Sequence, residues 1–91
     1  MKYTVKFSTK FNKDLKKLQK QDKNLNELKK VISILANGEK LPEKYNEHFL
    51  IGNYNGCLEC HIKPDWLLIY RFIDNELILY LIRSGSHSDL F

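Results

Sequence analysis

The chain has 91 residues, a size typical of one domain, with 43% hydrophobic residues and two cysteines. It has no apolar run of about 20 residues that could span a bilayer, and no apolar signal segment follows Met1, so the sequence argues against a membrane or exported protein and predicts a cytoplasmic one. Its net charge of +4 conceals an asymmetry, because residues 1–45 carry twelve lysines against five acidic residues, whereas residues 46–91 carry three basic residues against six acidic ones.

The lysine-rich first half favours a polyanionic partner, either a nucleic acid or an acidic protein. A second interpretation stays open at this point, because the outer faces of many helices are rich in lysine only to remain solvated. Charge alone does not separate the two.

The first predicted element is a strand over residues 2–7, where apolar and polar side chains alternate with a period of two. An amphipathic helix follows, with Ser8 or Thr9 as its N-cap. Its apolar side chains recur at helical spacing, and its lysines lie mostly on the remaining surface. The apolar positions are Phe11, Leu15 and Leu18, and the lysines are Lys10, Lys13, Lys16, Lys17 and Lys20.

A second amphipathic helix begins at Leu25, after the polar residues 21–24, and ends at Asn37-Gly38, where glycine can adopt the left-handed conformation. So short a break predicts an antiparallel helical hairpin. The apolar stripes of both helices suit the covering of a sheet, so we assign them to the core.

After Leu41-Pro42 the sequence changes to short apolar segments separated by turn residues. The predicted strands are residues 58–62, 66–73 and 77–83, with a further short strand near residues 48–51. Residues 66–73 and 77–83 are apolar on both faces, which predicts central strands with helices on one side. The expected fold is a single α+β domain over residues 1–91, in the order β-α-α-β-β-β(-β), with an antiparallel sheet packed against the N-terminal helical hairpin.

Cys57, Cys60 and His61 match the C-x-x-C-H pattern of haem attachment. We reject a haem because Met1 is the only methionine, no export signal is visible, and residues three apart on a strand point to opposite faces. The same geometry argues against a disulfide or a shared metal, so both thiols are expected to be free and reduced.

Three histidines lie in the second half of the chain, and imidazole can donate and accept protons near neutral pH. His61 and Asp65 flank the turn between two strands, and His87 follows the last strand, which ends at the same edge of the sheet. His48 follows the crossover from the helices. The tail from Ser84 to Phe91 ends in an apolar pair that can anchor it, so the sequence predicts that the histidines meet in one acid/base site.

Zinc held by the three histidines is the competing interpretation. None of the histidine pairs has a spacing such as H-x-x-x-H, so we expect neither a metal nor another cofactor. For a polyanionic substrate without a metal, the natural chemistry is cleavage of RNA by its own 2′-hydroxyl. Arg83 can meet the phosphate, and Trp66 or Phe91 can stack on a base.

Two stretches of the chain resemble the YafQ family of bacterial toxins, which belong to the RelE/ParE superfamily of toxin–antitoxin systems. One is His61-Ile62-Lys63-Pro64-Asp65-Trp66-Leu67-Leu68-Ile69-Tyr70, and the other is Arg83-Ser84-Gly85-Ser86-His87-Ser88-Asp89-Leu90-Phe91. The histidine before a glycine-containing turn, His48 before Gly52, fits the same pattern. Leu58 is a departure, since members of the family often have an arginine there.

The resemblance implies an endoribonuclease, an mRNA interferase that cuts mRNA in the A site of the 70S ribosome, needs no metal and is inhibited by a cognate antitoxin protein. The family's catalytic positions correspond to His48, His61, Asp65 and His87, with Phe91 supporting the site. We expect Arg83 and Trp66 to contact the substrate and Lys10, Lys13 and Lys17 to grip RNA. A gyrase-directed toxin that cleaves nothing, or a plain RNA-binding module, remains the alternative.

Overall fold

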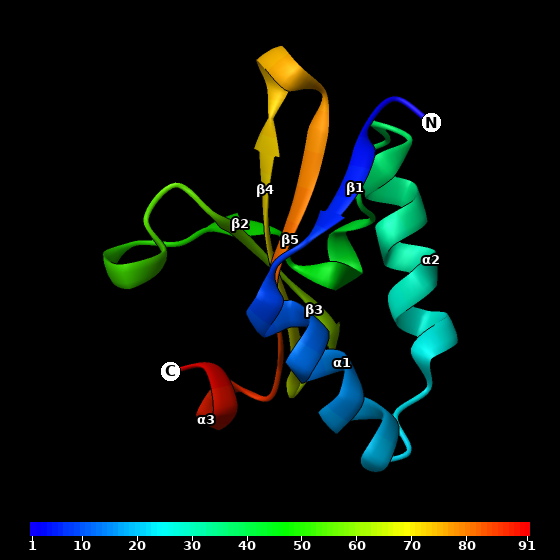
Figure 1. The fold of residues 1–91 in the computed structure, drawn as a ribbon, viewed down its shortest axis with the longest axis vertical. Helices are drawn as coiled ribbons and strands as arrows, with labels where there is room; N and C mark the ends of the chain where they lie inside the picture. The colour runs from blue at the N-terminus through cyan, green and yellow to red at the C-terminus, as the bar shows by residue number, and fades with distance from the viewer.

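A five-stranded sheet with the strand order β1-β5-β4-β3-β2 forms the centre of the protein (Figure 1). The structure is a computed structural model and describes residues 1–91. Its elements are β1 (Thr4–Phe7), α1 (Thr9–Lys20), α2 (Leu25–Ala36), β2 (His48–Phe49), β3 (Leu58–Lys63), β4 (Trp66–Ile73), β5 (Ile78–Gly85) and α3 (His87–Leu90). The α+β class and the predicted order of helices and strands are confirmed, including the short strand at His48.

The sheet is mixed rather than wholly antiparallel. Strands β2 to β5 are antiparallel to their neighbours as predicted, but β1 pairs with β5 in parallel. Ser8 joins β1 to α1 in this arrangement: its backbone N–H donates to the Leu81 carbonyl at 3.0 Å, and its hydroxyl donates to the Ile82 carbonyl at 2.7 Å. The same hydroxyl accepts the Phe11 N–H at 2.9 Å and caps α1. The helix therefore starts beside β5, directly after the parallel pairing of Phe7 with Leu81.

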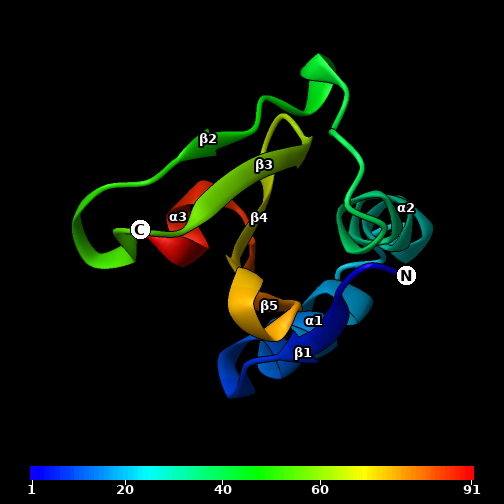
Figure 2. The ribbon, with the colours of Figure 1, turned by 90° about the horizontal axis from the view of Figure 1, so that it is seen from above.

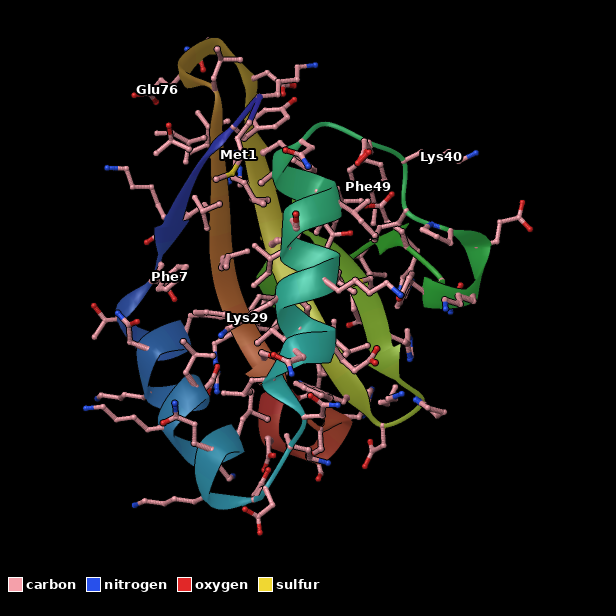
Figure 3. The ribbon with its side chains drawn as sticks, turned by 90° about the vertical axis from the view of Figure 1, so that its right-hand side faces the viewer. Met1, Phe7, Lys29, Lys40, Phe49 and Glu76 are labelled. Carbon is pink, nitrogen blue, oxygen red and sulfur yellow. The ribbon has the colours of Figure 1, made fainter.

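Helices α1 and α2 cover one face of the sheet and enclose the main core. Figure 3 looks onto α2, which lies across β3, β4 and β5, and Figure 2 shows the two helices from above. The buried residues of this core include Phe11, Leu18, Leu28, Val31, Leu35, Cys60, Ile62, Trp66, Leu68, Tyr70, Leu79 and Leu81. None of the helices is both long enough and apolar enough to cross a membrane.

The opposite face of the sheet carries a second, smaller core built around α3. Leu67 and Ile69 of β4 point to this face, where they pack with Cys57 and with Leu90 of α3. Figure 1 places α3 and the C-terminus on the side of the sheet away from α2. The prediction of helices on one side only is therefore incomplete, and this second face is the one that positions the functional side chains.

Both cysteines are free, as predicted. Cys60 lies in the main core and Cys57 in the second core, on opposite faces of the strand region that holds them. Burial raises the pKa of the Cys60 thiol to about 12, so this thiol stays protonated at neutral pH.

Candidate active site

Two of the three histidines meet on the second face of the sheet, on either side of Glu59. The pairing of β2 with β3 places His48 opposite Glu59, and His61 lies two residues further along the same face of β3. His48 Nε2 is 3.3 Å from Glu59 Oε1, and His61 Nε2 is 3.6 Å from the same oxygen. Glu59 is only 5% exposed. The predicted meeting of His48 and His61 is thus confirmed, and it is organised by a buried carboxylate.

Backbone carbonyls fix the orientation of both imidazole rings. His48 Nδ1 is 2.8 Å from the Asn46 carbonyl oxygen, and His61 Nδ1 is 3.3 Å from the Pro64 carbonyl oxygen. Because a carbonyl oxygen only accepts hydrogen bonds, each Nδ1 carries a hydrogen and donates it. Each Nε2 therefore faces Glu59 and is the nitrogen available for chemistry.

The C-terminal tail is held in place, as its apolar end predicts. Ser86 and Asp89 form a capping box at the start of α3, and Leu90 is buried. The Lys17 ammonium lies 2.8 Å from Asp89 Oδ1, and hydrogen bonds from Lys17 and Ser86 lower the pKa of Asp89 to about 2. Lys17 of α1 thus helps to hold α3 in place through this ion pair, whereas the sequence predicts for it only a contact with RNA.

His87 lies at the first position of α3 and stacks on Phe91, with ring centroids 4.8 Å apart. Phe91 in turn meets the edge of the Tyr54 ring at 5.5 Å. The backbone N–H of His87 donates to Asp65 Oδ1 at 3.4 Å. Phe91 is 56% exposed, so it packs against the site and also presents ring surface to solvent.

The turn at Pro64-Asp65 lies between His61 and His87 and contacts both. His61 donates to the Pro64 carbonyl, and the next residue, Asp65, accepts from His87. The predicted gathering of these three residues at one end of the sheet is therefore present. The His87 ring does not belong to the cluster around Glu59, so the site has two parts.

A groove of about 470 Å³ lies beside the His87 part of the site. It is lined by Lys10, Ile51, Asn53, Tyr54, Leu90 and Phe91. Lys10, which the sequence predicts to grip RNA, is one of the residues that line this groove, and Lys13 is exposed on the same helix. The groove therefore combines a basic side chain with aromatic rings, which are the kinds of group that contact the phosphates and bases of a nucleic acid.

Arg83 is paired with Asp14 of α1. Its Nε and Nη2 donate to the two carboxylate oxygens at 2.8 and 3.1 Å, and the Ser84 N–H also donates to Asp14. The hydrogen bond to Asp14 is the main cause that raises the pKa of Arg83. Two of its five N–H donors are used by Asp14, so Arg83 is a fixed cation with donors left for a phosphate.

The predicted stacking of Trp66 on a base is wrong. Trp66 is 2% exposed and belongs to the main core under the helices. Its Nε1–H donates to Ser84 Oγ at 3.0 Å. Trp66, Leu68 and Tyr70 are spaced two residues apart on β4, so all three point to the same face of the sheet, the one away from the histidines.

Glu59 is the site residue that the sequence analysis missed. The alternation of Glu59 with His61 already placed both on one face, but the sequence does not reveal the register of a strand as short as β2. Without that register, His48 cannot be placed opposite Glu59.

With the geometry described, the comparisons with known proteins identify the class. Residues 3–91 match a family of bacterial toxins from type II toxin–antitoxin systems. That family is YafQ, described as "Bacterial toxin of type II toxin-antitoxin system, YafQ", and the chain belongs to it. The resemblance found in the sequence is therefore confirmed.

Three similar proteins illustrate the likeness. The mRNA interferase toxin YafQ of Escherichia coli strain K12 is 38% identical over 88 residues, which are 96% of this chain and 94% of that protein. A metal-bound toxin from Helicobacter pylori has a TM-score of 0.92 at 46% identity, over 98% of this chain and 99% of that one. The E. coli DinJ-YafQ complex gives a TM-score of 0.89 at 37% identity, over 98% of both chains.

Proposed function

We propose that this chain is an mRNA interferase, an endoribonuclease whose target is mRNA in the A site of the 70S ribosome in the cytoplasm. The observation that carries the proposal is the placement of all three histidines on one face of the sheet, in a chain whose E. coli relative is an mRNA interferase. Inhibition by binding alone needs no proton donors, so this set of side chains favours cleavage over the gyrase-directed alternative and over a plain RNA-binding module.

The reaction that suits these side chains is attack by the ribose 2′-hydroxyl on the adjacent phosphate. One group takes the 2′-proton and another gives a proton to the leaving 5′-oxygen. His87 serves as one of these groups, and His61 with His48 serves as its complement. Phe91 orients the His87 ring by stacking, and Asp65 holds the start of α3 by accepting the His87 N–H. This chemistry needs no metal and no other cofactor.

Basic side chains of α1 and β5 provide the grip on RNA. Lys10 lines the groove, Lys13 is exposed on the same helix, and Arg83 is fixed on the sheet by Asp14. Contacts of this kind release counterions from the phosphates, so RNA binding should weaken steeply as the salt concentration rises. Lys17 contributes less directly, because its ammonium is already paired with Asp89.

The partner proposed for this toxin is an antitoxin protein. Complexes of the E. coli relative with DinJ have been solved. We propose that the antitoxin of this chain lays an acidic, partly disordered segment over the basic helices and the groove, where it excludes RNA.

Mapping of RNA 5′-ends tests the proposed function. Brief expression of the wild-type chain should produce new 5′-ends within translated messages, and His87→Ala should abolish them. Lys30→Ala, a change of an exposed lysine on α2, on the opposite face, is the matched control and should cut like the wild type. Undiminished cutting by His87→Ala contradicts the assignment. Growth arrest with intact mRNA and blocked DNA supercoiling would instead favour the gyrase-directed alternative.

A further inference from the structure

Strand β2 carries His48 into the site, but it has little packing of its own. It consists of His48 and Phe49, and both residues are exposed. The apolar burial that holds most strands in a sheet is therefore missing. The position of β2 depends instead on its hydrogen bonds to β3 and on contacts just beyond its ends. After the strand, the Leu50 N–H donates to the Cys57 carbonyl at 2.9 Å.

The contact before the strand comes from the main core. Tyr70 of β4 is fully buried, at 0% exposure, and its hydroxyl donates to Glu47 Oε2. Glu47 is otherwise exposed. Successive residues of an extended chain point to opposite faces, so the Glu47 side chain reaches towards the main core while His48, the next residue, faces Glu59. One contact on the core side of the sheet thus fixes the residue that precedes His48.

The Tyr70 hydroxyl is a permanent donor to this carboxylate. Burial is the main cause that raises the pKa of Tyr70, and Glu47 raises it further, so the hydroxyl stays protonated at neutral pH. The ring is held by the core and meets the edge of Phe72 at a centroid distance of 6.0 Å. A rigid donor therefore holds the Glu47 carboxylate in one place.

Asn46 connects this contact to the orientation of the His48 ring. Its carbonyl oxygen is 2.8 Å from His48 Nδ1, so the direction of that carbonyl decides how the ring turns. Asn46 has a φ of 51°, in the left-handed region, and follows the buried Tyr45. Glu47 lies between Asn46 and His48, so a rotation of its backbone would separate the carbonyl from the ring.

We propose that Tyr70, acting through Glu47, positions the His48 imidazole for RNA cleavage. The contact keeps Nδ1 on the Asn46 carbonyl and leaves Nε2 as the nitrogen for proton transfer. Tyr70 is a positioning residue, because its burial on the other face of the sheet keeps it from RNA. Its role in cleavage rests on the proposed function, in which His48 acts with His61, whereas its effect on the ring does not.

NMR of the imidazole nitrogens in the purified full-length chain tests the orientation. At a pH where the histidines are neutral, the nitrogen chemical shifts of His48 show how its proton is shared between Nδ1 and Nε2. In the wild type the proton should stay on Nδ1. Tyr70→Phe and Glu47→Ala should move it towards Nε2, because Glu59 Oε1, 3.3 Å away, then competes as the acceptor. Glu47→Gln keeps an acceptor oxygen for Tyr70 and should keep the wild-type shifts.

Tyr80→Phe is the matched control. It removes the hydroxyl of a half-buried tyrosine on β5, which two strands separate from β2, and should leave the His48 shifts unchanged. Circular dichroism spectra confirm that each variant is folded. Wild-type His48 shifts in both Tyr70→Phe and Glu47→Ala would overturn the positioning role, and so would an equal change in Tyr80→Phe.

Rates of mRNA cleavage on translating ribosomes separate positioning from a general loss of structure. A general acid or base contributes about 10²–10⁴-fold to a rate, and a misoriented ring loses part of this. Tyr70→Phe should therefore lower kcat about tenfold with little change in KM. In a His48→Ala background the same change should have no further effect. An equal fall in both backgrounds would show a merely structural role and overturn the proposal.

The two assays distinguish this proposal from the proposed function. If the wild-type chain does not cut RNA, the proposed function fails, while the NMR shifts still decide whether Tyr70 orients His48. If the wild type cuts RNA and His48→Ala cuts it equally fast, the proposed function stands and the role of Tyr70 in cleavage is overturned.

Discussion

Leu90 is the side chain that docks α3, and its removal provides a sharp test of the second part of the site. Helix α3 has four residues, and Leu90 is its only buried one, at 7% exposure. It packs with Leu67 and Ile69 of β4. Replacing a buried leucine by alanine costs about 2–5 kcal/mol. Because α3 is the last element of the chain, it can undock without unfolding the sheet, so the cost should appear in the docking equilibrium.

A loss of 2 kcal/mol raises the undocked population of α3 by about 30-fold. Leu90→Ala should therefore lose most RNA cleavage, because His87 and Phe91 leave the site, while the thermal midpoint of the sheet changes little. Hydrogen exchange of the amides in residues 87–91 measures the undocking directly. Leu90→Met keeps the volume and should keep most activity. Full cleavage by Leu90→Ala, with α3 amides unprotected, would refute the role of the tail.

Three further predictions follow from particular contacts. Trp66→Phe should lower the free energy of unfolding in urea by about 1–3 kcal/mol, because it removes the N–H that donates to Ser84 Oγ. RNA affinity should stay unchanged. Weaker RNA binding by a variant of full stability would show that Trp66 does stack on a base. Asp14→Asn should lower the free energy of unfolding by about 1.5–3 kcal/mol through the lost carboxylate bonds to Arg83, and an unchanged urea midpoint would show that the pair is dispensable. The pKa of Asp89 is lowered to about 2, so the ionised Asp89 stabilises α3 above about pH 4, and this stabilisation is lost as the pH falls towards 2. The NMR chemical shifts of the Leu90 methyl groups should follow this loss. Asp89→Asn should remove the pH dependence.

The sequence predicts the local elements well because each has a local physical signal. Ser8 caps α1 as expected, the polar break at residues 21–24 separates the helices, and β4 covers residues 66–73 as its apolar run indicates. The anchoring of the tail also follows from local chemistry, because Leu90 is an apolar side chain that packs against the second face of the sheet. The four-residue helix itself was missed, although the Ser86-x-x-Asp89 capping box is its signal.

What the sequence could not predict depends on pairing between distant segments. To predict that β1 pairs with β5 in parallel, one must know where α1 begins relative to β5. The role of Glu59 requires the register between β2 and β3, and a two-residue strand carries no pattern that fixes it. Trp66 was misassigned because its strand is apolar on both faces, so the sequence alone does not say which face of β4 meets the helices.

The central claim is that the RNA is cut by its own 2′-hydroxyl, with imidazoles on one face of the sheet moving the protons. The most direct measurement uses a translating ribosome loaded with a message that carries a single 2′-deoxynucleotide at the mapped cleavage position. The account predicts that the all-ribose message is cut to a 2′,3′-cyclic phosphate and a 5′-hydroxyl, and that the deoxy message stays intact. Equal cleavage of both messages, or 5′-phosphate ends, would contradict it.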